Sequence, residues 1–183
     1  MKEEAGMLPL DRLERLGVSV GYSGCLKGCG RHQHADIGLV GLRTAIYGPT
    51  QKSARLFLGG EYTDGKATAR LTLMAIPLHG INDIIHVILD EFEQSGHLDF
   101  EAFSKHTLNH FSTDFLALWF LAKCYTQKSD TLKISGSAPL LHSTREEQRI
   151  VESHFPELNL QHEEKQPFYG GIQEISQRLW GES

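Results

Sequence analysis

The chain has 183 residues, of which 40% are hydrophobic and 22% are charged, a composition ordinary for one globular domain with a buried core. Its formal net charge of −5, without a basic run, excludes the footprint of a nucleic-acid-binding protein and a polybasic membrane patch. Three cysteines and no apolar signal segment after Met1 argue against a disulfide scaffold and for the reducing cytoplasm. We therefore expect small molecules or other proteins as partners, and no membrane association.

The first half of the chain predicts a short helix followed by strands. Leucines recur at near-helical spacing over residues 8–16, and Gly17 ends the pattern. Alternation of apolar and polar residues predicts four strands, at 18–22, 36–44, 55–62 and 68–76. The last three are expected to be antiparallel, with residues 45–54 as a polar connection, Asp64-Gly65 as a hairpin turn and Pro77 as the end of the last strand.

The second half predicts helices. Apolar residues from Ile81 to Phe92 form a full helical stripe, and Gly96 is a plausible C-cap. His86 lies off that stripe and is expected to be solvated. Further helices are predicted over 99–108 and from Ser112 or Thr113 to Tyr125, the second with a hydroxyl N-cap and with Cys124 as a small buried residue.

The C-terminal part predicts a long loop and two more helices. Residues 126–143 are polar, Thr144 to Glu147 offer a capping box for a helix that Pro156 ends, and Gly170-Gly171 precede a last helix anchored by Trp180. The predicted fold class is α+β, with a small antiparallel or mixed sheet of three to four strands packed with four to six helices. The predicted organisation is a domain over 1–125 and a helical extension over 126–183.

One glycine-rich turn carries the chemistry. Cys25 and Cys29 lie in a Cys-x3-Cys spacing between two predicted strands, and glycine occupies positions 24, 28 and 30. This is a usual setting for thiolates aimed at a metal centre, and glycine lets a bulky prosthetic group approach the backbone closely. Two thiolates do not complete a four-ligand site, so further ligands must come from elsewhere.

The residues around this turn resemble a known family. Segment 24–31 reads Gly-Cys-Leu-Lys-Gly-Cys-Gly-Arg, and segment 35–41 reads Ala-Asp-Ile-Gly-Leu-Val-Gly. Both resemble a motif found late in siroheme-dependent sulfite and nitrite reductases, and segment 55–60, Arg-Leu-Phe-Leu-Gly-Gly, is similar to a later strand of that family. The resemblance extends over roughly residues 8 to 105 and is specific over residues 24 to 41.

The resemblance implies a 4Fe-4S cluster and a siroheme, because the family binds the two groups together. A cubane cluster takes four cysteine thiolates. Cys25 would be a cluster ligand, and Cys29 would be shared between the cluster and the siroheme iron. Gly28 and Gly30 would allow the macrocycle to approach.

Two cations near the thiolates have two interpretations each. Lys27 belongs to a Leu-Lys pair that replaces the Pro-Asn of the family, and Arg31 matches the family. Each side chain either pairs with a siroheme carboxylate or is an ordinary solvated cation. The Leu-Lys replacement also makes the loop less rigid than in the family.

The family's other machinery is missing from this sequence. The chain has no Cys-x5-Cys pair and no cluster of basic residues for an anionic substrate. The resemblance therefore implies the C-terminal part of such an oxidoreductase, inactive in isolation. Its expected partners are an N-terminal reductase half or a second copy of this chain, together with an electron-donor protein.

Other interpretations of the cysteine turn remain open. Cys25, Cys29, His32 and His34 are four residues of the types that bind structural zinc, although their spacing is unusual for a zinc finger. Two chains sharing one cluster, or a shortened non-catalytic module without metal, are further alternatives. The sequence contains no nucleophile elbow, no phosphate-binding loop and no dinucleotide fingerprint.

Overall fold

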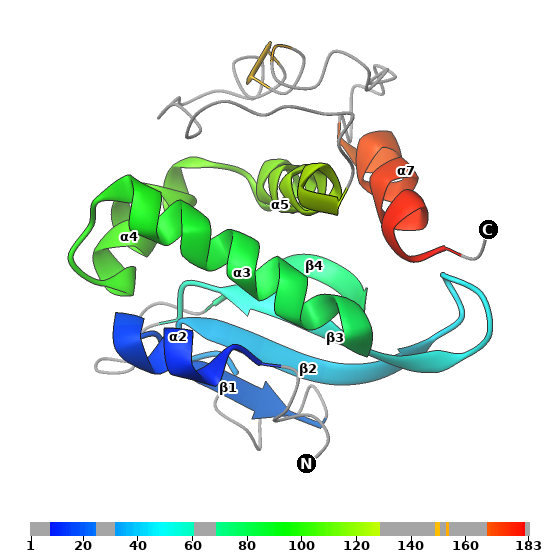
Figure 1. The fold of residues 1–183 in the computed structure, drawn as a ribbon, viewed down its shortest axis with the longest axis horizontal. Helices are drawn as coiled ribbons and strands as arrows, with labels where there is room; N and C mark the ends of the chain where they lie inside the picture. Colours follow the sequence, from blue (N-terminus) through cyan, green and yellow to red (C-terminus); the bar gives the residue numbers. More distant parts are fainter. Residues whose placement is uncertain are drawn as a thin grey trace.

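A four-stranded mixed sheet packed against helices forms the molecule, which confirms the predicted α+β class (Figure 1). The computed structural model describes residues 8–24, 32–60, 69–128, 149–150, 153 and 168–181. The strands lie in sequence order across the sheet as β1 (Val20–Ser23), β2 (Ile37–Thr44), β3 (Gln51–Leu58) and β4 (Arg70–Pro77). The β2–β3 and β3–β4 pairs are antiparallel, as predicted. β1 is parallel to β2, a direction that the sequence did not predict.

The β2–β3 hairpin is longer than predicted. Its register pairs Arg43 with Lys52 and Thr44 with Gln51, so β3 begins inside the segment that the sequence predicted as a connection. These side chains are exposed or half-buried, and backbone pairing continues past the buried part of the sheet without an apolar pattern to signal it. β3 also ends at Leu58, earlier than the predicted end at Tyr62, because Gly59 leaves the strand with a φ of 83°. The predicted turn at 64–65 lies outside the described residues.

β4 runs directly into α3 (Leu78–Ser95). Pro77 is the last residue of β4 and the N-cap of α3, which confirms the predicted strand end. Gly96 ends the helix with a φ of 73°, as the C-cap prediction requires. The predicted stripe of α3 is buried, namely Ile81, Ile84, Ile85, Ile88, Leu89 and Phe92.

Register shifts interrupt the β3–β4 pairing in two places. Such irregularities make an edge strand, here β4, less able to pair with a strand of another chain.

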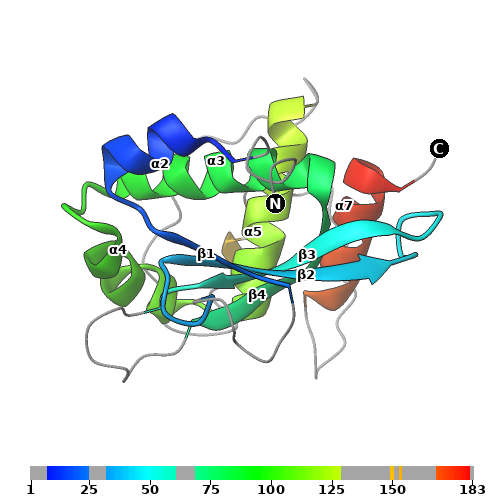
Figure 2. The same ribbon diagram turned by 90° about the horizontal axis from the view of Figure 1, so that it is seen from below.

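α2 (Leu10–Leu16) precedes β1 and lies beside α3 (Figure 2). Gly17 ends it with a φ of 65°, which confirms the predicted stop. Leu13 is buried, while the remaining residues of this short helix are exposed or half-buried. Its attachment to the molecule therefore depends on few apolar contacts and on the polar contacts described below.

α4 (Phe100–His106), the 3-10 turn η1 (Leu108–His110) and α5 (Thr113–Lys128) follow. Ser112 Oγ accepts a hydrogen bond from the Phe115 backbone at 3.2 Å, which confirms the predicted hydroxyl cap. α5 continues to Lys128, three residues into the predicted loop. Every residue from 115 to 122 is buried, so α5 is the central helix of the layer.

α7 (Tyr169–Trp180) packs on α5 and carries the predicted anchor. Gly170 and Gly171 belong to the helix instead of preceding it, because packing of the helix outweighs the modest intrinsic cost of glycine. Trp180 is buried, edge-on to Tyr47 at 5.5 Å between ring centroids. Residues 129–148, and most of the predicted helix at 144–155, lie outside the described part of the chain.

The core lies between the sheet and the helices. α3, α5 and α7 lie over the same face of the sheet in both ribbon views (Figures 1 and 2). The largest fully buried side chains are aromatic: Trp119, Phe100, Phe103, Phe115, Phe120 and Phe168. Within the described residues, no helix has the length and apolar composition needed to cross a membrane.

Candidate functional site

The cysteine turn itself lies outside the described residues. This applies to all the predicted site residues, namely Cys25, Lys27, Gly28, Cys29, Gly30 and Arg31. The structure describes the two ends of the turn, at Gly24 and at His32. The structure therefore shows how the residues on either side of the predicted site are held.

A buried hydrogen bond joins the two ends. Ser23 Oγ lies 2.8 Å from His32 Nδ1, and Ser23 and His32 are 3% and 0% exposed. Ser23 is paired with Val40, whose neighbour Leu39 belongs to the core beneath the helices. Because neighbours in a strand face opposite ways, Ser23 and Val40 lie on the sheet face away from the helical core. The turn therefore leaves β1 and returns to β2 with its ends fastened on that face.

The returning end is also fastened to the start of β1. The backbone N–H and the hydroxyl of Ser19 both donate to Asp36 Oδ2 at 2.9 Å, and the Asp36 N–H donates to Ser19 Oγ at 2.9 Å. The pKa of Asp36 is raised, chiefly by burial of its carboxyl group and also by the nearby charges of Glu101 and Asp99. The hydrogen bonds from Ser19 lower the same pKa and only partly offset the rise. This pair fixes where β2 begins relative to β1.

Two glycines let the returning segment pack against the sheet. A Cβ built on Gly38 would lie 2.0 Å from the His32 carbonyl oxygen, and one built on Gly60 would lie 2.6 Å from the carbonyl oxygens of Gln33 and Ala35. The Gly60 N–H donates to the Ala35 carbonyl at 3.2 Å. Segments 35–41 and 55–60, which the family resemblance identified separately, are therefore in direct contact through Ala35 and Gly60.

The two histidines of the zinc interpretation lie in different environments. The His32 ring is fully buried and packs on Phe57 at 5.3 Å between centroids, whereas His34 is exposed. His32 Nδ1 is already hydrogen-bonded to Ser23. This arrangement weighs against both imidazoles facing one zinc ion. Sequence patterns did not reveal the pairing of Ser23 with His32, because it joins residues across a turn without periodicity.

The third cysteine, Cys124, is a buried residue of a helix and does not belong to the cysteine turn. Cys124 is a free thiol on α5, 1% exposed, which confirms its predicted role as a small buried residue. Burial raises the pKa of its thiol to about 11, so it is held as an unreactive neutral group. α5 lies over the core face of the sheet (Figure 2), whereas Ser23, which is bonded to His32, lies on the opposite face. Cys124 is therefore unsuited to be a third ligand beside Cys25 and Cys29.

The donor set of one chain does not fit a complete cubane cluster. The sequence holds three cysteines, and the buried Cys124 removes one of them. A cubane needs four thiolates. In the part of the chain that the structure describes, no group of three or more histidine, cysteine, aspartate or glutamate residues is arranged to hold a metal. A cluster at this turn would need two ligands from another polypeptide segment.

Comparisons with known proteins add no family assignment. No protein-family model matches the chain, and no curated protein matches it either.

Proposed function

We propose that this chain is the cofactor-holding part of a sulfite or nitrite reductase-like oxidoreductase, contributing Cys25 and Cys29 to a shared 4Fe-4S cluster and Cys29 to siroheme. The observation that carries the proposal is the Cys-x3-Cys turn within segment 24–41. Lys27 and Arg31 are proposed to pair with siroheme carboxylates, and Gly28 and Gly30 to admit the macrocycle. When bound, the two groups would supply electron transfer to an anionic substrate.

The described residues on either side of the cysteine segment are joined to each other, which supports the proposal. The Ser23–His32 hydrogen bond fastens both ends, and the packing on Gly38 and Gly60 leaves the returning segment little room to move. Metal affinity rises when ligands are held in position before binding, because less chain entropy is lost. Joined ends would therefore favour metal binding by Cys25 and Cys29, which together form a half-site, that is, two of the four thiolates that a cubane cluster needs.

The half-site requires a partner. Two thiolates on this chain leave two to be supplied by an N-terminal reductase half or by a second copy of the chain, and an electron-donor protein completes the proposal. The isolated chain is expected to have no reductase activity, because the first cysteine pair and the basic substrate pocket are absent from its sequence. A reducing compartment such as the cytoplasm would keep these two cysteines from forming disulfides before a metal binds.

The experiment is anaerobic reconstitution with iron and sulfide, followed by metal analysis and a measurement of molecular mass. Two copies sharing one cluster would give a dimer with about two iron atoms per chain and cluster absorption in the visible range. Cys25→Ser and Cys29→Ser should each abolish iron binding. Cys124→Ala is the matched control, because this buried thiol is remote from the turn, and it should keep the iron.

Other outcomes contradict the proposal. About one zinc ion per chain, lost in His32→Asn or His34→Asn, would indicate the structural zinc site instead. Reconstituted protein without metal or visible absorption, alone and with a polypeptide carrying a Cys-x5-Cys pair, would indicate a non-catalytic module. Equal iron binding by Cys25→Ser and the unaltered chain would exclude the assigned ligands.

A further inference from the structure

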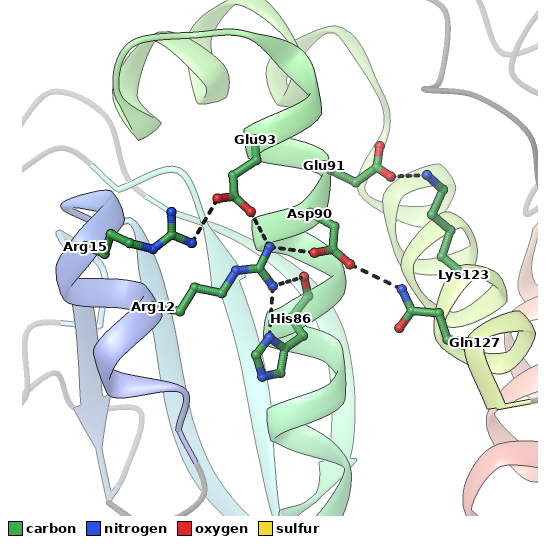
Figure 3. A network of polar contacts seen from close by, with 8 residues as sticks. All are labelled: Arg12, Arg15, His86, Asp90, Glu91, Glu93, Lys123 and Gln127. Carbon is green, nitrogen blue, oxygen red and sulfur yellow. Dashed lines mark hydrogen bonds and ion pairs between the residues drawn. The ribbon is translucent and has the colours of Figure 1, made fainter.

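Two arginines of α2 contact α3, and Arg12 makes most of these contacts (Figure 3). Arg12 Nη2 donates to Asp90 Oδ1 at 2.5 Å and also contacts the Glu93 carboxylate. Arg12 Nη1 donates to His86 Nδ1 at 2.9 Å and makes a longer contact of 3.4 Å with the His86 carbonyl oxygen. The Arg12 side chain is 19% exposed. One guanidinium thus contacts three side chains spaced along one face of α3.

The contact with His86 specifies the protonation state of the imidazole. A guanidinium has five N–H donors and no acceptor. His86 Nδ1 must therefore present its lone pair to Arg12, and in the neutral ring the proton must be on Nε2. A proton taken up from solvent on Nδ1 removes this acceptor and places a second cation beside the guanidinium.

We propose that Arg12 and His86 form a proton-controlled latch between α2 and α3, in which neutral His86 accepts a hydrogen bond from Arg12 and protonation of His86 loosens α2. The proposal is independent of any metal or cofactor at the cysteine turn. It also corrects the expectation of a solvated His86, because this ring is half-buried and bonded to Arg12.

The charged groups around His86 limit the size of the effect. From α2, Arg15 donates to Glu93 at 3.0 Å and adds a second cation on this side. On α3 itself, Asp90 and Glu93 attract both Arg12 and a protonated His86, so Arg12 keeps its carboxylate partners when His86 is charged. From α5, within the described residues, the side chain that contacts Asp90 is the uncharged Gln127, whose amide donates a hydrogen bond to the Asp90 carboxylate at 3.2 Å.

Ion pairs also connect α3 to α5 nearby, and one of them joins Glu91 of α3 to Lys123 of α5 (Figure 3). Lys128 of α5 pairs with Asp83 of α3 at 2.7 Å. This pair lies between α3 and α5 and does not include α2. Protonation of His86 therefore removes one of several contacts between α2 and α3, and the expected result is a loosened helix instead of a detached one.

α2 is the element that would respond. Of its seven residues Leu13 alone is buried, so polar contacts carry much of its attachment. Its C-cap at Gly17 leads within three residues to β1, which holds Ser23. A looser α2 would transmit its motion to the strand that precedes the cysteine turn.

The test is hydrogen exchange of the α2 amides by NMR, measured at pH 7.5 and pH 5.5 and expressed as protection factors corrected for intrinsic exchange. The amides of Leu13 and Val18, hydrogen-bonded to the Pro9 and Leu13 carbonyls, are the reporters, and amides in α5 report global opening. Protection at α2 relative to α5 should fall about three- to tenfold at the lower pH, the effect of losing one hydrogen bond.

Two variants make the test specific. His86→Asn retains an acceptor near the position of Nδ1 without titrating, so its α2 protection should not change with pH. His79→Asn is the matched control, an exposed histidine in the first turn of the same helix, and it should behave as the unaltered protein. Asp36, whose pKa is raised by burial, is present in all three proteins, so the comparison between them does not depend on it.

Three results would overturn the latch. The first is α2 protection that does not depend on pH in the unaltered protein. The second is a full pH dependence in His86→Asn. The third is a ¹⁵N chemical shift showing that His86 Nδ1 carries a proton at pH 7.5, because that tautomer is incompatible with a hydrogen bond from Arg12.

Discussion

Replacing Gly38 with alanine tests how the residues that follow the cysteine segment, from His32 on, pack against the sheet. A Cβ at this position would lie 2.0 Å from the carbonyl oxygen of His32 and 2.8 Å from its carbonyl carbon. Gly38 is not among the described glycines with positive φ, so its backbone suits alanine. The whole cost of the substitution therefore comes from the steric contact.

The structure indicates a large cost. The obstacle is backbone, which cannot move aside by changing rotamer, and the separation must grow from 2.0 Å to at least 3.0 Å. That shift displaces His32 from Ser23 and from Phe57. Overpacking costs about 1–3 kcal/mol, and a backbone obstacle puts Gly38→Ala at the upper end, about 3 kcal/mol. The melting temperature should fall by about 6–12 °C.

Urea unfolding followed by circular dichroism measures this loss. Gly24→Ala is the matched control at the other end of the turn, because a Cβ there meets nothing within 4 Å. It should change the free energy of unfolding by less than about 0.5 kcal/mol. A Gly38→Ala variant as stable as Gly24→Ala would refute the described packing of residues 32–36.

Two further predictions concern groups in the helical layer. Lys123 and Glu91 form an ion pair with side chains only 12% and 10% exposed. Lys123→Met alone should lower the free energy of unfolding by about 3–5 kcal/mol, because it leaves the buried Glu91 carboxylate without its partner, and the double variant with Glu91→Leu should regain most of that loss. Urea unfolding that shows the same loss in the single and the double variant would contradict the pairing. Burial raises the pKa of Cys124 from 9.0 to about 11, so the folded protein holds this proton more tightly than the unfolded chain. The free energy of unfolding should then be unaffected by this thiol below about pH 9 and fall towards pH 11, and Cys124→Ala should show a smaller fall in parallel urea titrations.

Local patterns predicted the elements that bury a regular face or end in a specific cap. The stripe of α3 with Gly96, the stop of α2 at Gly17 and the hydroxyl cap of α5 at Ser112 are all confirmed. Predictions were wrong where polar residues continue a strand, at Gln51 to Ser53, and where packing holds glycines inside a helix, at Gly170 and Gly171. In both cases the deciding interaction is made with another element and leaves no periodic signal in the segment itself.

The features of the candidate site likewise fall into those that consecutive residues specify and those that depend on contacts between distant residues. The thiolates, their spacing and their glycines are properties of consecutive residues, and the sequence by itself determined them. The contacts of Ser23 with His32, of Gly38 with the His32 backbone and of Arg12 with His86 join residues that only the chain's path brings together. Tertiary structure decided these, because a hydrogen bond or a steric contact depends on distance in space, which hydrophobic periodicity along the chain does not specify.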